Sequence, residues 1–133
     1  MSEKKTVLIV EDEKPLQNAI KIKLEKHGLA TLTARTAEQA LGHIEDVDID
    51  GVWLDHYLLG QHDGLYIVGQ MKSEDSKWKH IPIFVVSNTA TEDKVNTYLK
   101  FGVEKYYTKA ENKLEDIIAD VSSTLMNKNN SDI

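Results

Sequence analysis

Charged and hydroxyl side chains follow four short apolar runs of this chain. They are Glu11 and Asp12 after residues 7–10, Asp55 after residues 51–54, Ser87 after residues 81–86, and Lys109 after residues 106–108. A carboxylate beside a bound cation can attack a phosphoryl group, while an amine and a hydroxyl stabilise the phosphoryl oxygens. If the fold gathers these side chains, Asp55 is the best-placed nucleophile.

A shared pocket for Glu11, Asp12 and Asp55 requires charge compensation. Carboxylates near 5 Å apart repel by roughly 3 kcal/mol per pair at an effective dielectric constant of about 20, so the cluster needs a cation or raised pKa values. Mg²⁺ prefers oxygen ligands. The chain has no cysteine, and the loop residues His56 and His62 are expected to be solvated, since no third ligand has suitable spacing. The sequence therefore predicts a magnesium site.

The elements that must position these residues alternate along the chain. Strands are predicted near residues 7–10, 30–34, 51–54, 81–86 and 106–108, and helices near residues 16–24, 37–44, 65–71, 95–99 and 114–125. Strict alternation predicts a doubly wound α/β fold with a five-stranded parallel sheet covered on both faces. In the flavodoxin-like strand order 2-1-3-4-5, the first and third strands are neighbours, and their carboxyl ends bring the three acids together.

Composition limits the class of protein. The 133 residues, 41% of them hydrophobic, are enough for one domain, expected at residues 1–126 with a polar tail at 127–133. The net charge of −6 opposes direct binding to nucleic acid, and the N-terminal apolar run is too short for a signal peptide or a membrane span. A chain without cysteine agrees with a reducing compartment. We expect a soluble, cytoplasmic protein.

These residues resemble the receiver domain of two-component response regulators, over about residues 5–125. Glu11-Asp12 resembles the family's acidic pair, Val52-Trp53-Leu54-Asp55 its phosphoacceptor strand, Val85-Val86-Ser87 its switch hydroxyl and Tyr107-Thr108-Lys109 its essential lysine, while Tyr106 matches the aromatic residue that rotates on activation. Only a polar tail follows the last predicted helix, so we expect a stand-alone, CheY-like receiver, or part of a longer protein.

The resemblance implies a ligand set and partners. It implies that Asp12 and Asp55 bind Mg²⁺ directly, that Glu11 binds it closely or through water, and that the backbone carbonyl of Tyr57 completes the protein ligands. The phosphodonor would be a histidine kinase or a phosphotransfer protein. The chain would be a phosphoacceptor rather than an enzyme, although it assists its own phosphorylation and slow dephosphorylation.

The resemblance also implies a mechanism of output. Ser87 would move toward the phosphoryl group and Tyr106 would turn inward, which alters the face made by residues 93–101, 105–108 and 112–126. A downstream protein would bind this face, and the chain would be a monomer or a phosphorylation-dependent dimer.

The chain departs from the family pattern at three places. Leu59 stands where the family usually has proline, and Asp63-Gly64 comes one residue late, so we expect a reshaped loop over residues 56–63. Asn88, a larger residue than usual, is expected with Tyr57 to narrow access to the phosphoryl group. Ala110 replaces the proline that usually follows the lysine through a cis bond, and a non-proline cis bond costs about 2.5–4 kcal/mol.

Three other classes of protein share part of this pattern. A phosphohydrolase of the haloacid dehalogenase type needs a second acid where Tyr57 stands. A flavin-binding protein needs hydrogen-bond donors after the first strand, where this chain carries acids. The remaining alternative is a receiver-like adaptor that works by surface binding without phosphorylation, and the retained site residues favour the phosphorylated switch over it.

Overall fold

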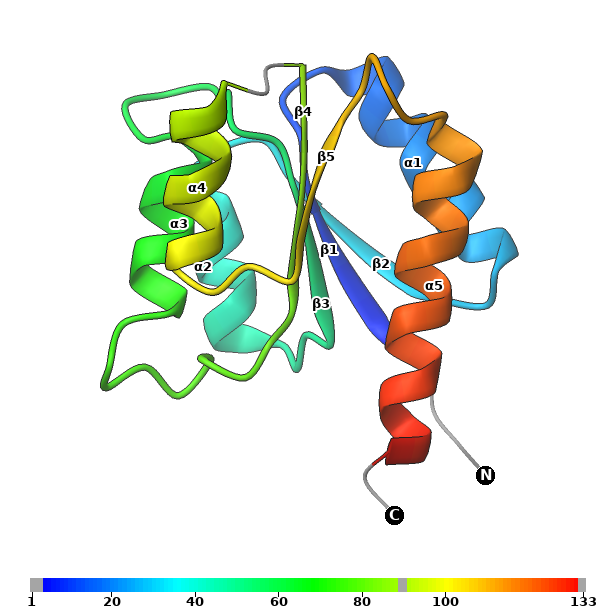
Figure 1. Cartoon of the computed structure of the whole chain (residues 1–133). Coiled ribbons are helices and arrows are strands. Elements are labelled where there is room, and N and C mark those ends of the chain that lie inside the picture. The colour runs from blue at the N-terminus through cyan, green and yellow to red at the C-terminus, as the bar shows by residue number, and fades with distance from the viewer. Residues whose placement is uncertain (1–3, 89–90, 132–133) are drawn as a thin grey trace.

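A central sheet with helices on both faces makes up the protein (Figure 1). The computed structural model describes residues 4–88 and 91–131, with side chains described as far as residue 127. The strands are β1 (Thr6–Val10), β2 (Ala30–Ala34), β3 (Gly51–Leu54), β4 (Ile83–Ser87) and β5 (Lys105–Thr108). The helices are α1 (Lys14–Lys26), α2 (Ala37–Asp46), α3 (Gly64–Met71), α4 (Glu92–Lys100) and α5 (Leu114–Ser131).

The strand order is β2-β1-β3-β4-β5, and every pairing is parallel. Val10 lies opposite Leu54, and Ser87 lies opposite Thr108, so the carboxyl ends of neighbouring strands stop at the same level. The predicted fold class and strand order are both confirmed. The first residues after β1 and β3 consequently emerge side by side.

Alternating side chains of the buried strands build two cores. Leu8, Val52 and Val85 point to the face covered by α2, α3 and α4, while Ile9 and Trp53 point to the face covered by α1 and α5 (Figure 1). Nearly all strand residues of β1, β3 and β4 are buried, as expected for a parallel sheet with both faces covered. The two cores hold the strand ends rigidly, and this fixes the geometry of any site built there.

Proline and glycine stand at helix ends where their backbone preferences suit them, and one helix is longer than expected. Pro15 lies in the first turn of α1, and Gly28 and Gly102, with φ angles of 88° and 94°, follow the ends of α1 and α4. The backbone of α5 continues to Ser131, beyond the predicted end near residue 126, and the last two residues of the expected tail lie outside the described residues. Among the helices that the structure describes, none is both long and apolar enough to cross a membrane.

Two glycines offer opposite tests of this packing. A Cβ added at Gly51 in β3 would lie 2.9 Å from a Leu125 methyl group of α5, whereas a Cβ at Gly42 in α2 would meet no atom within 4 Å. We expect Gly51→Ala to lower the free energy of unfolding by about 1–3 kcal/mol through overpacking, and Gly42→Ala to raise it by about 0.5–1 kcal/mol through helix propensity. Chemical denaturation of both variants measures this, and equal stability of the two would contradict the packing described.

Candidate functional site

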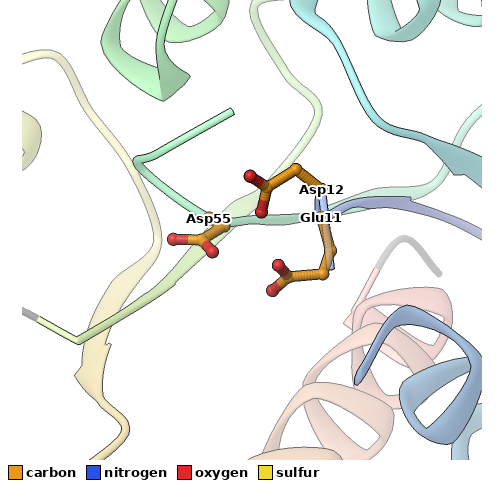
Figure 2. A group of neighbouring side chains, drawn as sticks. All are labelled: Glu11, Asp12 and Asp55. Atoms are coloured by element: carbon orange, nitrogen blue, oxygen red, sulfur yellow. The ribbon is translucent and has the colours of Figure 1, made fainter. Parts of the chain in front are cut away.

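Three carboxylates converge at the carboxyl edge of the sheet (Figure 2). Glu11 and Asp12 come from the loop after β1, and Asp55 follows β3. One oxygen of each residue lies within 4.8 Å of the others. Glu11 and Asp55 are buried, and Asp12 is half-buried, so the cluster opens to solvent on the side of Asp12. The structure thus brings together the three acids that the sequence singled out.

Backbone hydrogen bonds extend the sheet by one residue and fix these acids. The Asp55 N–H donates to the carbonyl of Val10 at 3.0 Å, and the Glu11 N–H donates to the carbonyl of Ala34 at 3.0 Å. Both acids therefore continue the ladder beyond the assigned strand ends. Their backbones cannot separate without breaking sheet hydrogen bonds, so the fold keeps the two residues close together.

Lys109 reaches the cluster from the end of β5. Its Nζ lies 3.3 Å from Asp55 Oδ2 and 3.4 Å from Glu11 Oε1. The Lys109 N–H donates to the carbonyl of Ser87 at 2.9 Å, and Ser87 itself has no exposed surface. The amine and the hydroxyl predicted from sequence therefore come from adjacent strands at the same edge as the acids.

The pKa of Glu11 is the one most affected by this arrangement of acids. Burial, together with the neighbouring Asp55 carboxylate, raises the pKa of Glu11 from 4.5 to about 7, although the Glu13 N–H and Lys109 act in the opposite direction. The Glu13 N–H donates to Glu11 Oε2 at 3.1 Å. Lys109 therefore does not offset the combined effect of burial and of the Asp55 carboxylate on the pKa of Glu11, and a further cation at the cluster would lower that pKa.

Two neighbours of the acidic loop were not foreseen from the sequence. Arg35 Nε and Nη2 donate to the carbonyl of Asp12 at 3.0 and 2.9 Å, and Gln17 Nε2 donates to the carbonyl of Glu11 at 3.0 Å. These bonds fix the backbone that carries the two acids. Arg35 directly follows β2, so its place at the carboxyl edge of the sheet was a usable signal, whereas Gln17 offered none.

The acids lie in an open pocket of about 600 Å³, which Arg35, Tyr57, Asn88 and Lys109 also line. Tyr57 is largely exposed, and Lys94 of α4 donates to its hydroxyl at 3.0 Å while lying 4.8 Å from its ring centroid. Tyr57 and Asn88 therefore stand at the pocket, where the sequence placed them.

The expectation that His56 is solvated is wrong. Its side chain is buried, and its Nδ1 lies 2.6 Å from the Tyr98 hydroxyl of α4. His62 is partly exposed and stacks on Tyr66 with ring centroids 3.7 Å apart. Among the described residues, the cluster suited to a metal contains carboxylates alone, so neither histidine belongs to it.

Three local features describe the loop between β3 and α3, for which a shape different from that of the family stays a prediction. Leu59 forms an isolated bridge with Thr36, Gly60 adopts a φ angle of 91°, and Asp63 accepts from the Tyr66 N–H to cap α3. In the described part of the chain no peptide bond is cis, so Ala110 follows Lys109 through a trans bond.

Tyr106 of β5 lies half-buried against the core on the α4 side of the sheet. Its ring centroid is 5.7 Å from that of Tyr98. Trp53 is buried in the core on the α1 and α5 side, and Trp78 packs against the core on the α4 side, so both tryptophans serve packing.

Comparison with known families identifies the chain. The model of the response regulator receiver domain matches residues 7–122. The chain belongs to this family. Receiver domains of two-component response regulators act as phosphoacceptor switches, so the predicted class of function is confirmed.

One curated relative is the phosphate regulon transcriptional regulatory protein PhoB of Pseudomonas aeruginosa. It is 34% identical over 105 residues, which cover 79% of this chain and 45% of PhoB. The receiver described here thus spans about half the length of that relative.

Solved structures share the fold. A CheY-like receiver domain protein from Methanospirillum hungatei gives a TM-score of 0.85 at 20% identity, covering 97% of this chain and 99% of that one. The phosphorylated cyanobacterial phytochrome response regulator RcpA gives a TM-score of 0.83 at 24% identity, covering 93% of this chain and 95% of RcpA. The Mn²⁺-bound response regulator Rcp1 gives a TM-score of 0.79 at 22% identity, covering 90% of this chain and 92% of Rcp1.

The raised pKa of Glu11 predicts a pH dependence for the metal-free receiver. The folded state keeps the Glu11 proton up to about pH 7, whereas the unfolded chain releases it near 4.5, so this residue lowers the free energy of unfolding as pH rises between those values. Glu11→Gln has no proton to release. Its stability relative to wild type should therefore rise over that window by an amount on the order of 2 kcal/mol.

Chemical denaturation at pH 5, 6, 7 and 8 in the presence of EDTA measures this difference. Glu13→Gln, which removes an exposed carboxylate from the same loop, is the matched control. A pH-independent difference between Glu11→Gln and wild type would contradict the electrostatic description.

Proposed function

We propose that this receiver is switched by phosphorylation of Asp55, which requires Mg²⁺. The observation that carries the proposal is the convergence of three carboxylates within 4.8 Å, with Lys109 3.3 Å from Asp55. A buried acid beside a cationic amine and a hydroxyl is the arrangement that an acyl phosphate needs at its carboxylate and its phosphoryl oxygens.

The residues at the site fit a hard divalent ion. The converging donors are all carboxylate oxygens, and the raised pKa of Glu11 reflects its burial and the neighbouring Asp55 charge, which an ion would neutralise. Asp12 and Asp55 would hold Mg²⁺ directly, Glu11 closely or through water, and Tyr57 through its backbone carbonyl. When bound, the ion neutralises charge on the transferring phosphoryl group. The similar receiver Rcp1 is described in a Mn²⁺-bound form, which supports a divalent ion here.

Asp55 would take the phosphoryl group from a histidine kinase or a phosphotransfer protein. An Asp55 carboxylate oxygen forms the new bond to phosphorus as the phosphorus–nitrogen bond of the donor phosphohistidine breaks. Lys109 and Ser87 then compensate the charge on the phosphoryl oxygens. The similar regulator RcpA is described as phosphorylated. The transfer would take place in the cytoplasm, in keeping with a chain that has no cysteine.

Output would pass through the α4-β5-α5 face. Ser87 moves toward the phosphoryl group, Tyr106 turns inward, and the surface made by α4, β5 and α5 changes. Leu99 and Phe101 expose apolar surface at the end of α4, where a protein partner can bury it. The receiver would act as a monomer or as a phosphorylation-dependent dimer.

Phosphorylation of Asp55 can be tested by intact mass. After incubation with Mg²⁺ and a small acyl phosphate, wild type should gain one phosphoryl group, and Asp55→Asn and an EDTA-treated sample should gain none. A receiver that binds Mg²⁺ but forms no adduct, beside a functioning positive control, would instead favour the phosphorylation-independent adaptor.

The output face can be tested by amide spectra recorded with and without a phosphoryl mimic. Chemical-shift changes should extend beyond the pocket to α4, β5 and the first turns of α5, and Tyr106→Ala should reduce them at a distance from Asp55. Spectra that change only around the pocket would exclude this face as the output surface.

A further inference from the structure

A buried histidine joins the phosphoacceptor loop to α4. His56 directly follows Asp55, and its imidazole Nδ1 lies 2.6 Å from the hydroxyl of Tyr98, which has no exposed surface. The two rings meet edge to face with centroids 5.7 Å apart. One hydrogen bond between two buried side chains therefore links the residue after Asp55 to α4.

The surroundings define the direction of this bond. Burial raises the pKa of the Tyr98 phenol, which keeps its proton and can donate it in a hydrogen bond. Asp63 Oδ2 lies 3.7 Å from His56 Nε2 and favours a proton on that nitrogen. Nδ1 is then the acceptor, and the Tyr98 hydroxyl donates to it.

The Tyr98 hydroxyl also lies against the backbone of the phosphoacceptor loop. A Cβ added at Gly64 would lie 2.8 Å from that hydroxyl and 2.7 Å from the carbonyl oxygen of Asp55. The Gly64 N–H donates to the carbonyl of His56 at 2.8 Å. Tyr98, Gly64 and the peptide between Asp55 and His56 are thus packed without spare room, and glycine at position 64 is required for the contact.

We propose that Tyr98 is a positioning residue for the phosphoacceptor site, and that it acts through its hydrogen bond to His56. The proposal rests on the function proposed above. His56 stands between Asp55 and Tyr57, the two residues of this loop assigned to the metal. A fixed imidazole holds the backbone on both sides of it, so the ligands are preorganised before the ion binds.

The same bond gives α4 a direct connection to the site. Tyr98 also lies beside Tyr106, with ring centroids 5.7 Å apart. A shift of the loop at Asp55 consequently reaches α4 and the neighbourhood of the switch aromatic through two side chains. Loss of the Tyr98 hydroxyl should loosen the loop and α4 together.

The test compares Tyr98→Phe with Tyr107→Phe, two changes that each delete the hydroxyl of a buried tyrosine and keep the ring. The Tyr107 ring packs in the core on the α5 side of the sheet, and its hydroxyl donates to the partly exposed Asp120, so this variant is the control for lost stability. The measurements are the dissociation constant for Mg²⁺ by calorimetry and the hydrogen exchange of backbone amides in residues 55–64 and in α4.

Tyr98→Phe should weaken Mg²⁺ binding by about three- to tenfold, the factor expected from one buried hydrogen bond, and should speed exchange in both segments. Tyr107→Phe should change Mg²⁺ binding by less than about twofold, because its hydroxyl touches neither segment. Unchanged Mg²⁺ binding in Tyr98→Phe, or an equal loss in both variants, would overturn the positioning role.

His56→Leu provides a second, independent variant. It removes the acceptor of the same bond, so it should weaken Mg²⁺ binding as Tyr98→Phe does, and the double variant should be no weaker than either single one. Additive losses would show that the two residues act separately. These readouts need no phosphoryl transfer. If wild type forms no adduct, the proposed function fails while the Mg²⁺ and exchange data still decide the role of Tyr98.

Discussion

Repulsion among three carboxylates that the sheet holds together is the constraint on which this site depends. The registered ends of β1 and β3 leave Glu11 and Asp55 side by side, and sheet hydrogen bonds prevent them from moving apart. Burial strengthens the repulsion because water screens it less. Lys109 contacts two of the three acids, yet the pKa of Glu11 remains raised. The fold thus holds negative charge that Lys109 does not fully compensate, and a hard divalent ion can neutralise it.

The rest of the protein keeps the three acidic residues in position. Two apolar cores clamp the sheet, Arg35 and Gln17 fix the backbone of the acidic loop, and Tyr98 fixes the loop after Asp55. These supports come from α1, from the residue after β2 and from α4, and α4 is distant in sequence from the other two. Rigid support of this kind is what keeps ligand oxygens at the separations that an ion requires.

The sequence predicted the fold and the acids because both depend on local signals. Apolar runs of strand length, alternating with helical periodicity, define the strands, and the strand ends define the edge where Glu11, Asp12 and Asp55 meet. The partnership of His56 with Tyr98 could not be predicted in the same way. It joins residues 42 positions apart, through a loop whose shape depends on Gly60 and Gly64. His56 lies in a polar loop, and the sequence therefore predicts a solvated histidine.

The C-terminal end of α5 could not be predicted from the apolar pattern of the sequence either. Apolar periodicity stops near Leu125, where the helix last contributes to the core, whereas the backbone stays helical to Ser131. Apolar periodicity marks only the part of a helix that packs against the core, so it does not show where a helix continues beyond that contact.

The most direct test of the central claim is calorimetric titration of Mg²⁺ at pH 7 in buffers of different ionisation enthalpy. If Glu11 shares its charge with Asp12 and Asp55, one Mg²⁺ should bind and displace part of a proton, and this proton release should disappear in Glu11→Gln. Absence of Mg²⁺ binding, or binding that survives unchanged when Asp12 and Asp55 are both replaced by asparagine, would contradict the account.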